Sequence, residues 1–302
     1  MKRIVFKKLV TIALSGLLVL AFAGCSSTTP TPSTSGATTA PSTSATTAPT
    51  GKVIKVLGST SVEPLAVSLG DAYKAKTGIS LEIQAPGSSQ GIQAIIDGTT
   101  EIGTSSRELT PEEAATKDLK QNVIAIDGIV LIVNPENTAS VKGLTKQQAT
   151  DIFSGKITNW KDVGGLDKQI AVINREESSG TRTAIQELLG LEIKNADGTK
   201  TSLLTKEGLT AGSQGEVKTT VATNTDAIGY VSLATVDNTV AGLSIDGVQP
   251  TVDNIKADKY ILKRNFLMLT KNPSADVKAF IDFVLSPEGQ ALVEKDKYIK
   301  VK

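Results

Sequence analysis

One segment of the chain, residues 174–182, combines the side chains that a small anion would need. It reads NREESSGTR and places Arg175, serine hydroxyls and Gly180 next to one another. The segment follows the apolar run 170–173 and precedes a helix-like stretch, 184–189. The first N–H groups of a helix lack partners and the helix dipole attracts negative charge, so this order predicts an anion-binding helix N-terminus. A plain N-cap is the alternative.

Three other turns have a related composition: GSTS at 58–61, GSSQG at 87–91 and GTSSR at 103–107. Each follows a strand-like segment, and ligands of open α/β sheets bind at the carboxyl ends of strands. Hydroxyls add hydrogen-bond donors without adding bulk, and glycine lets the backbone approach a ligand. Any one turn is accounted for by an N-cap, but four in the same context predict convergence on one cleft. No Gly-Lys-Ser/Thr follows residues 58–61, which disfavours nucleotide binding.

The arginines beside these turns have alternative roles. Arg175 and Arg182 would form surface ion pairs with neighbouring glutamates if they did not face a ligand. Arg107 either enters the site or lies exposed.

The residue types that are missing exclude several kinds of chemistry. The chain has no histidine and one cysteine, Cys25. A Ser-His-Asp triad and a His-ligated metal centre are therefore impossible, and a zinc-thiolate site is not expected. We predict no metal and no cofactor, and we expect the protein not to be an enzyme.

The elements that position the turns alternate between strands and helices. Strand-like segments at 53–57, 79–84 and 101–104 are each followed by a turn and a helix-like stretch, which indicates an α/β fold with a mostly parallel sheet. Two mostly apolar segments, 123–134 and 227–231, are predicted to cross between two lobes. Lobe 1 is then formed by residues 52–130 and 231–302, lobe 2 by residues 131–230, and the ligand lies between them.

The N-terminal part of the chain predicts secretion and anchoring. Residues 1–24 have a basic start, an apolar middle and a small-residue end, typical of a signal peptide. Cys25 follows Ala23 and Gly24, which resembles a lipoprotein acylation motif, although Phe22 stands where leucine is usual. Residues 25–51 are then an acylated cysteine and a Ser/Thr/Pro-rich disordered tether, whose composition also fits O-glycosylation.

The charge balance of the remaining chain disfavours a nucleic-acid partner. The full chain has 32 basic and 31 acidic residues, and removing the four basic residues of the signal peptide leaves 28 against 31. No basic surplus remains to bind a phosphate backbone.

Taken together, these motifs resemble the phosphate-binding lipoproteins that serve ABC-type phosphate importers, a family with the two-lobed, type II periplasmic-binding-protein fold. The resemblance covers the whole folded part, with its motifs in the family's order: GSTSVEP, APGSSQGI, EIGTSSREL, IFSGKITNW, NREESSGTR and AIGYVSL. It implies the following phosphate-binding residues: Thr60, Ser61, Ser88, Ser106, Arg175, Ser179, Gly180 and Thr181. Glu177 stands where the family has an acidic residue that orients the arginine.

The sequence departs from the family at Ser106, where the best-known members have an aspartate that accepts the proton of hydrogen phosphate. Serine carries no charge to repel an anion without that proton, so rejection of sulfate is not predicted.

The resemblance implies a monomeric receptor that closes on inorganic phosphate and delivers it to an ABC permease with its ATPase subunits. Its hinge would lie near 132–133 and 229–230. The lipid on Cys25 would hold it at the outer face of the cytoplasmic membrane of a Gram-positive bacterium. The same fold binding sulfate, molybdate or a phosphonate is one alternative. A cell-surface phosphate-ester hydrolase with Ser61 or Ser179 as nucleophile is another.

Overall fold

The computed structural model describes residues 51–196 and 199–301. The predicted signal peptide, Cys25 and the tether up to residue 50 lie outside these residues. Within the described part the chain alternates between strands and helices as predicted, and the α/β fold class is confirmed. No helix of residues 51–196 or 199–301 is long and apolar enough to cross a membrane.

Most strands of the described residues form one twisted, mixed sheet. Its order is β2-β1-β3-β13-β4-β10-β6-β9, and β11 also pairs with β4. The strands are β1 (Val53–Gly58), β2 (Ser80–Gln84), β3 (Ile102–Ser105), β4 (Leu119–Val133), β5 (Gly143–Leu144), β6 (Ala171–Arg175), β7 (Glu192–Lys194), β8 (Lys200–Ser202), β9 (Leu209–Ala211), β10 (Ala227–Ser232), β11 (Ala241–Gly242), β12 (Ser244–Ile245) and β13 (Lys263–Lys271). The β1–β2, β1–β3, β6–β9 and β6–β10 pairs are parallel, whereas β13 is antiparallel to β3 and β4.

Local signals account for most helix ends. Ser213 accepts a hydrogen bond from the third backbone N–H of its helix, and Gly190 ends another helix with φ of 68°. The helix expected at 92–97 begins earlier, at Ser88, because Gly87 makes the turn with φ of 139°. The α-helices are α1 (Glu63–Thr77), α2 (Ser88–Asp97), α3 (Pro111–Ala114), α4 (Lys146–Phe153), α5 (Gly180–Leu189), α6 (Gln214–Thr223), α7 (Val252–Lys256), α8 (Ala275–Val284) and α9 (Pro287–Lys295).

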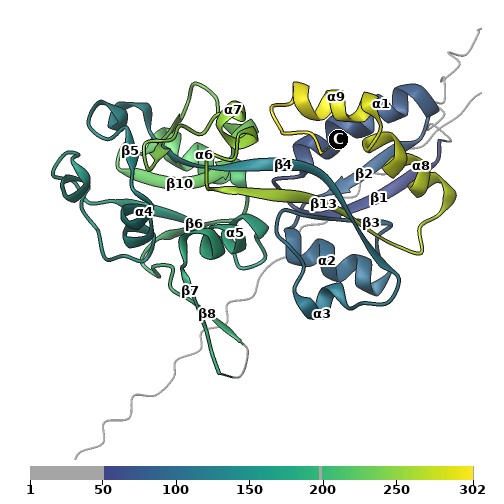
Figure 1. The fold of residues 1–302 in the computed structure, drawn as a ribbon, viewed down its shortest axis with the longest axis horizontal. Helices are drawn as coiled ribbons and strands as arrows, with labels where there is room; N and C mark the ends of the chain where they lie inside the picture. Colours follow the sequence, from purple (N-terminus) through teal and green to yellow (C-terminus); the bar gives the residue numbers. More distant parts are fainter. Residues whose placement is uncertain (1–50, 197–198, 302) are drawn as a thin grey trace, which may run out of the picture. The chain divides into compact units, whose positions relative to one another are not determined.

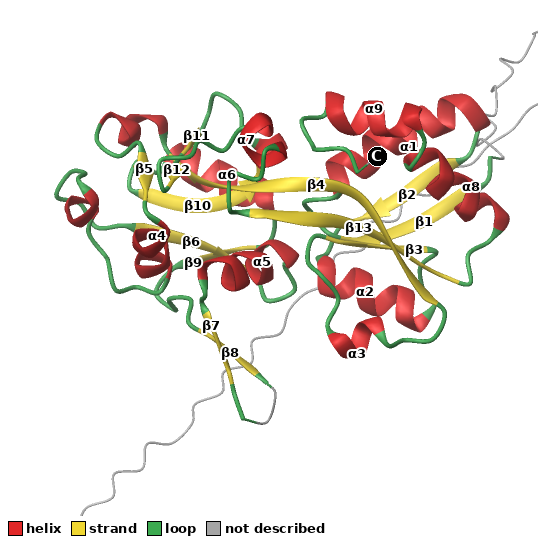
Figure 2. Cartoon of the chain, viewed as in Figure 1, coloured by secondary structure: helices red, strands yellow, loops and turns green. Residues whose placement is uncertain are grey.

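The described residues divide into two halves around β4 and β13, which lie side by side in Figure 2. We call 51–128 and 263–301 the first half, and 129–196 with 199–262 the second half. In the first half α1, α8 and α9 lie on one face of the sheet, and α2 and α3 lie on the other (Figure 1). Separate apolar cores fill the two halves, and α1 and α8 contribute to the first.

The crossing between the halves differs from the prediction. β4 crosses as expected, since its residues up to 128 pair with β13 and its last five pair with β10. The 227–231 segment does not cross, because it is β10 inside the second half, and the chain returns instead where β13 begins, with Lys263 opposite Gly128 of β4. β11 pairs with β4, β12 pairs with β5, and Ile255 of α7 packs in the second core. The chain therefore returns to the first half at about residue 263, later than the expected 231. The sequence did not show this, because a fully buried apolar strand has the same pattern whether it lies inside one half or leads to the other.

Candidate functional site

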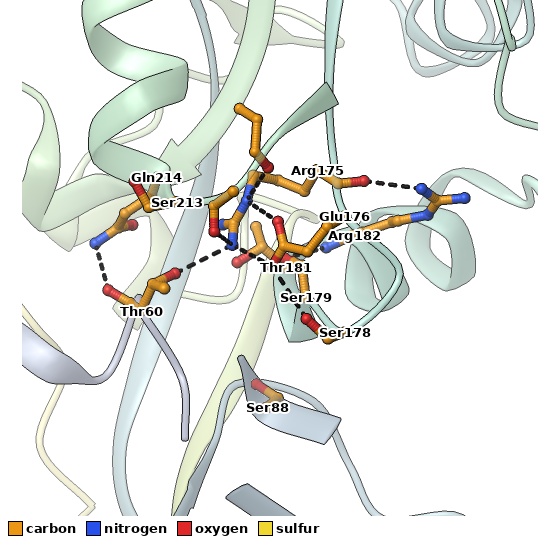
Figure 3. A network of polar contacts seen from close by, with 12 residues as sticks. Thr60, Ser88, Arg175, Glu176, Ser178, Ser179, Thr181, Arg182, Ser213 and Gln214 are labelled. Atoms are coloured by element: carbon orange, nitrogen blue, oxygen red, sulfur yellow. Dashed lines mark hydrogen bonds and ion pairs between the residues drawn. The ribbon is translucent and has the colours of Figure 1, made fainter. Parts of the chain in front are cut away.

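The four predicted turns meet at the carboxyl ends of β1, β3 and β6. We call the eight residues that the family resemblance implies the polar cluster: Thr60, Ser61, Ser88, Ser106, Arg175, Ser179, Gly180 and Thr181. The first four belong to the first half and the last four to the second, with Ser88 at the N-terminus of α2 and Gly180 at the N-terminus of α5. Figure 3 labels Thr60, Ser88, Arg175, Ser179 and Thr181. All eight are buried, and no side chain among them is more than 8% exposed. The structure therefore brings together residues up to 121 positions apart.

Arg175 is the central charge of the cluster. Its Nε and Nη2 donate to Glu176 Oε2 and Oε1 at 3.0 and 2.8 Å, and Nη2 also donates to the hydroxyl of Thr60 at 3.2 Å (Figure 3). The carbonyls of Ala211 and Gly212 accept from the same two nitrogens at 3.2 Å each. Nη1 is buried and has no hydrogen-bond partner among the residues that the structure describes. The guanidinium is thus fixed in place while one of its nitrogens keeps its donors free.

The orienting carboxylate is Glu176, and the prediction of Glu177 was wrong. Glu177 is exposed, whereas Glu176 forms a two-point ion pair with Arg175. The chain leaves β6 after Arg175 and turns at once, with Ser179 N–H donating to the carbonyl of Glu176 at 3.1 Å. This turn brings the next side chain back beside the guanidinium. Residues 176 and 177 are both glutamates, so only the turn determines which of them lies beside the guanidinium.

Hydroxyl groups from both halves contact one another within the cluster. Ser61 Oγ and Thr181 Oγ1 are 2.9 Å apart across the two halves. In the first half Ser59 Oγ donates to Ser106 Oγ at 2.9 Å, and Ser106 Oγ lies 3.2 Å from Ser88 Oγ. Ser59 was not among the predicted residues, although it lies in the same turn as Thr60. A hydroxyl both donates and accepts, so this set adapts to an anion's protonation state.

Gly180 lets the two halves approach closely. A Cβ at this position would lie 2.7 Å from Ser106 Oγ and would also collide with the hydroxyl of Ser88. Ser179 is the N-cap of α5 and accepts from the N–H of Arg182 at 3.3 Å. The first N–H groups of α5 therefore face the hydroxyls of the first half, with the positive end of the helix dipole toward them.

The two other candidate arginines are occupied elsewhere. Arg107 forms a two-point ion pair with Glu113 at 2.8 Å and also donates to Glu108 O and Ser89 Oγ. Arg182 Nη1 donates to the carbonyl of Arg175 at 2.8 Å. Both arginines therefore shape the surroundings of the cluster and do not point a free donor into it.

A buried ion pair between β4 and β13 supports the cluster. Arg264 of β13 donates from Nε and Nη2 to Asp127 Oδ2 at 3.1 and 3.0 Å, and from Nη1 to the carbonyl of Ser106 at 3.3 Å. Ser232 Oγ donates to Asp127 Oδ1 at 2.6 Å. Burial raises the pKa of Asp127, and Arg264 opposes this rise. The pair holds the Ser106 turn against the point where the chain crosses between the halves.

Tyr230 supports the backbone of Arg175. Its hydroxyl oxygen accepts from the backbone N–H of Arg175 at 3.1 Å. Burial raises the pKa of Tyr230 to about 12, so the phenol is neutral at physiological pH.

The arrangement suits binding better than bond cleavage. Within the described residues, neither Ser61 nor Ser179 donates its hydroxyl to a carboxylate that would act as a base. Residues 51–196 and 199–301 also contain no group of three or more His, Cys, Asp or Glu side chains that could hold a metal ion. A free arginine nitrogen, several hydroxyls and helix N-termini instead form a donor-rich site for a small tetrahedral oxyanion.

Comparison with known proteins agrees with this geometry. Residues 39–288 match the family model of the PBP superfamily domain. The chain is 33% identical to the phosphate-binding protein PstS of Borreliella burgdorferi, over 83% of this chain and 91% of that protein. It is 32% identical to the PstS of Bacillus subtilis, over 82% of this chain and 80% of that protein.

Solved structures are similar as well. A crystal structure with bound phosphate, described as a phosphate ABC transporter substrate-binding protein of Clostridium perfringens, has a TM-score of 0.77 and 42% identity, covering 83% of this chain and all of that one. An ABC-type phosphate transport receptor of Vibrio cholerae has a TM-score of 0.68 and 36% identity, covering 82% of this chain and all of that one.

Proposed function

Since the chain belongs to the PBP superfamily and phosphate-binding PstS proteins are among its relatives, we propose that it captures inorganic phosphate and delivers it to an ABC-type importer. Proteins of this kind are transport receptors and not enzymes. The polar cluster is the proposed phosphate site, with Glu176 orienting Arg175.

The single observation that carries this proposal is the buried, unpartnered Nη1 of Arg175. Burying a charged donor without a partner is costly, whereas an anion at this point would satisfy it with a charge-assisted hydrogen bond. The hydroxyls of Ser61 and Thr181 meet across the halves, and that of Ser88 is buried in the same cluster, so an oxyanion would receive donors from both halves.

The two halves are the proposed lobes, and closure is the proposed mechanism. Contacts such as Arg175 with Thr60 and Ser61 with Thr181 join the halves directly, so they exist only when the halves are closed. Binding favours closure because the closed form offers contacts that the open form lacks. β4, which continues from the first half into the second, and the return of the chain just before β13 would carry the hinge.

Anchoring and delivery belong to the same proposal. The motif at Cys25 supports a lipid anchor that holds a monomeric receptor at the outer face of the cytoplasmic membrane of a Gram-positive bacterium. There the closed form would dock on the permease of the importer, whose ATPase subunits drive uptake.

Calorimetry of the full chain in mild detergent tests the proposal, with phosphate and sulfate titrated separately. We expect tight binding of phosphate by the unmodified chain and no detectable heat with an Arg175→Ala variant that keeps its melting temperature. Binding of sulfate but not phosphate would favour the other-oxyanion alternative, and binding of neither would overturn the receptor function. Release of phosphate from a phosphate ester by the chain would favour the hydrolase alternative.

A further inference from the structure

The segment Ala211–Gln214 contacts both the arginine of the site and the opposite half. At one end the carbonyls of Ala211 and Gly212 accept from the guanidinium of Arg175. At the other end Gln214, the first residue of α6, donates from Nε2 to the carbonyl of Thr60 at 3.2 Å (Figure 3). This short segment therefore connects Arg175, the proposed anion-binding residue, to a contact between the halves.

The side-chain amide of Gln214 is buried, and both its oxygen and its nitrogen form hydrogen bonds. It is 4% exposed, and its Oε1 accepts from the backbone N–H of Ser232 at 3.2 Å. Ser232 ends β10 in the same half, so this bond fixes the orientation of the amide. The Nε2 group then points at the first half, 154 residues away in sequence.

The second half holds Thr60 at two points. Gln214 donates to its carbonyl and Arg175 to its hydroxyl. Thr60 and Gln214 also line a crevice of about 490 Å³ between the halves. Opening the halves at this crevice would break the Gln214–Thr60 hydrogen bond and leave both groups bonded to water, so the bond is present only in the closed form.

We propose that Gln214 is a positioning residue that latches the closed form by bonding the Thr60 carbonyl, without itself contacting the anion. This inference rests on the proposed phosphate-binding function. The latch predicts a specific kinetic pattern. Removing it leaves the donors that meet phosphate in the open form intact, so association is unchanged and release is faster.

The test compares Gln214→Ala and Gln214→Glu with the unmodified full chain in mild detergent. The ionised glutamate keeps an acceptor for Ser232 N–H but has no donor for Thr60 O, and its charge repels that carbonyl, so it breaks the contact between the halves and keeps the bond to Ser232. For both variants we expect the Kd for phosphate to rise about tenfold through a roughly tenfold faster release. Calorimetry measures the Kd, and chasing radiolabelled phosphate with unlabelled phosphate measures the release rate.

Gln290→Ala is the matched control. Gln290 is also a buried glutamine with both amide ends bonded, but its partners, Ile124 O, Val284 O and Val301 N–H, all lie in the first half. We expect this variant to lose stability and to release phosphate at the unmodified rate.

The outcomes separate the two proposals. Phosphate binding by the unmodified chain, together with an unchanged release rate in Gln214→Glu, would overturn the latch alone. Faster release in Gln290→Ala by the same factor would also overturn it, because general destabilisation would then explain the effect. Absence of phosphate binding by the unmodified chain would overturn the proposed function and the latch with it.

Discussion

Arg175 Nη2 donates to the hydroxyl of Thr60 at 3.2 Å, so the charge of the site and the first hydroxyl turn meet across 115 residues of sequence. The same guanidinium is held by Glu176 and by two backbone carbonyls. In the proposed receptor this geometry would couple ligand binding to the closure of the two halves, and the following predictions depend on it.

Arg175→Lys should abolish tight phosphate binding, with a Kd raised about 100-fold or more. A lysine ammonium cannot bond Glu176, two carbonyls and Thr60 and still present a free donor. Calorimetry with phosphate measures the effect. Arg107→Lys is the matched control, because both terminal nitrogens of Arg107 are bonded to protein groups, and its Kd should change less than about threefold. Equal losses in the two variants would contradict the assignment of Arg175.

Gly180→Ala should weaken phosphate binding about 100-fold while the melting temperature without phosphate changes little. The added Cβ would collide with the hydroxyls of Ser88 and Ser106 only when the halves close, and overpacking of this kind is destabilising. Calorimetry and thermal unfolding measure the two effects. Gly215→Ala is the control, because a Cβ there meets only Ser213 Oγ at an ordinary 3.7 Å. Normal phosphate affinity in Gly180→Ala would show that closure does not bring these groups together.

Ser106→Asp should increase the preference for phosphate over sulfate at least tenfold. A carboxylate between Ser59 and Ser88 would accept the proton of hydrogen phosphate and repel sulfate, which has no proton to share. Paired titrations with the two anions at the same ionic strength give the ratio. Ser106→Asn has nearly the same shape without the charge, and it should leave the ratio near that of the unmodified chain. A ratio that rises equally in both variants would assign the effect to shape.

Arg264→Met should lower the free energy of unfolding by about 3–5 kcal/mol at neutral pH, because it leaves Asp127 buried without its cation. Burial already raises the pKa of Asp127, and losing Arg264 raises it further. A raised folded-state pKa gives stability that is present below the unfolded pKa and is lost as pH rises through the folded value. The variant should therefore resist urea better at about pH 5 than at about pH 8. Asp127→Asn in the same background should remove this pH dependence, and a pH dependence that persists would exclude Asp127 as its source.

The protein should unfold as pH rises from about 10 toward about 12. Burial raises the pKa of Tyr230 from 10.0 to about 12, and it also raises the pKa of Tyr260 and Tyr298. The folded state thus disfavours tyrosinate, so the stability from these groups is complete below their unfolded pKa and is lost above it. Circular dichroism and tyrosinate absorbance followed against pH should change together. Tyrosinate absorbance that rises near pH 10 without unfolding would contradict the burial of these phenols.

Much of the local structure could be predicted from sequence because its signals are local. Alternating apolar segments, serine and threonine caps and helix-ending glycines specify β1, α1 and β6 with α5 within a few residues each. The order of the hydroxyl and glycine turns predicted that they would converge on one cleft, and the resemblance to a known family implied both the eight residues of the polar cluster and the anion. Their roles at the ligand stay predictions that the variants above test.

Only the tertiary structure determined the features that depend on contacts between residues distant in sequence. The sequence did not distinguish Glu176 from Glu177, because the turn after β6 alone determines which carboxylate lies beside Arg175. It placed the return of the chain at β10 instead of at the start of β13, because both strands are buried and apolar and only their pairing partners differ. It also gave no signal for Gln214, whose importance comes from a carbonyl 154 residues away. Periodicity and capping record each residue's immediate neighbours, whereas closure of the two halves depends on hydrogen bonds that exist only after the sheet has formed.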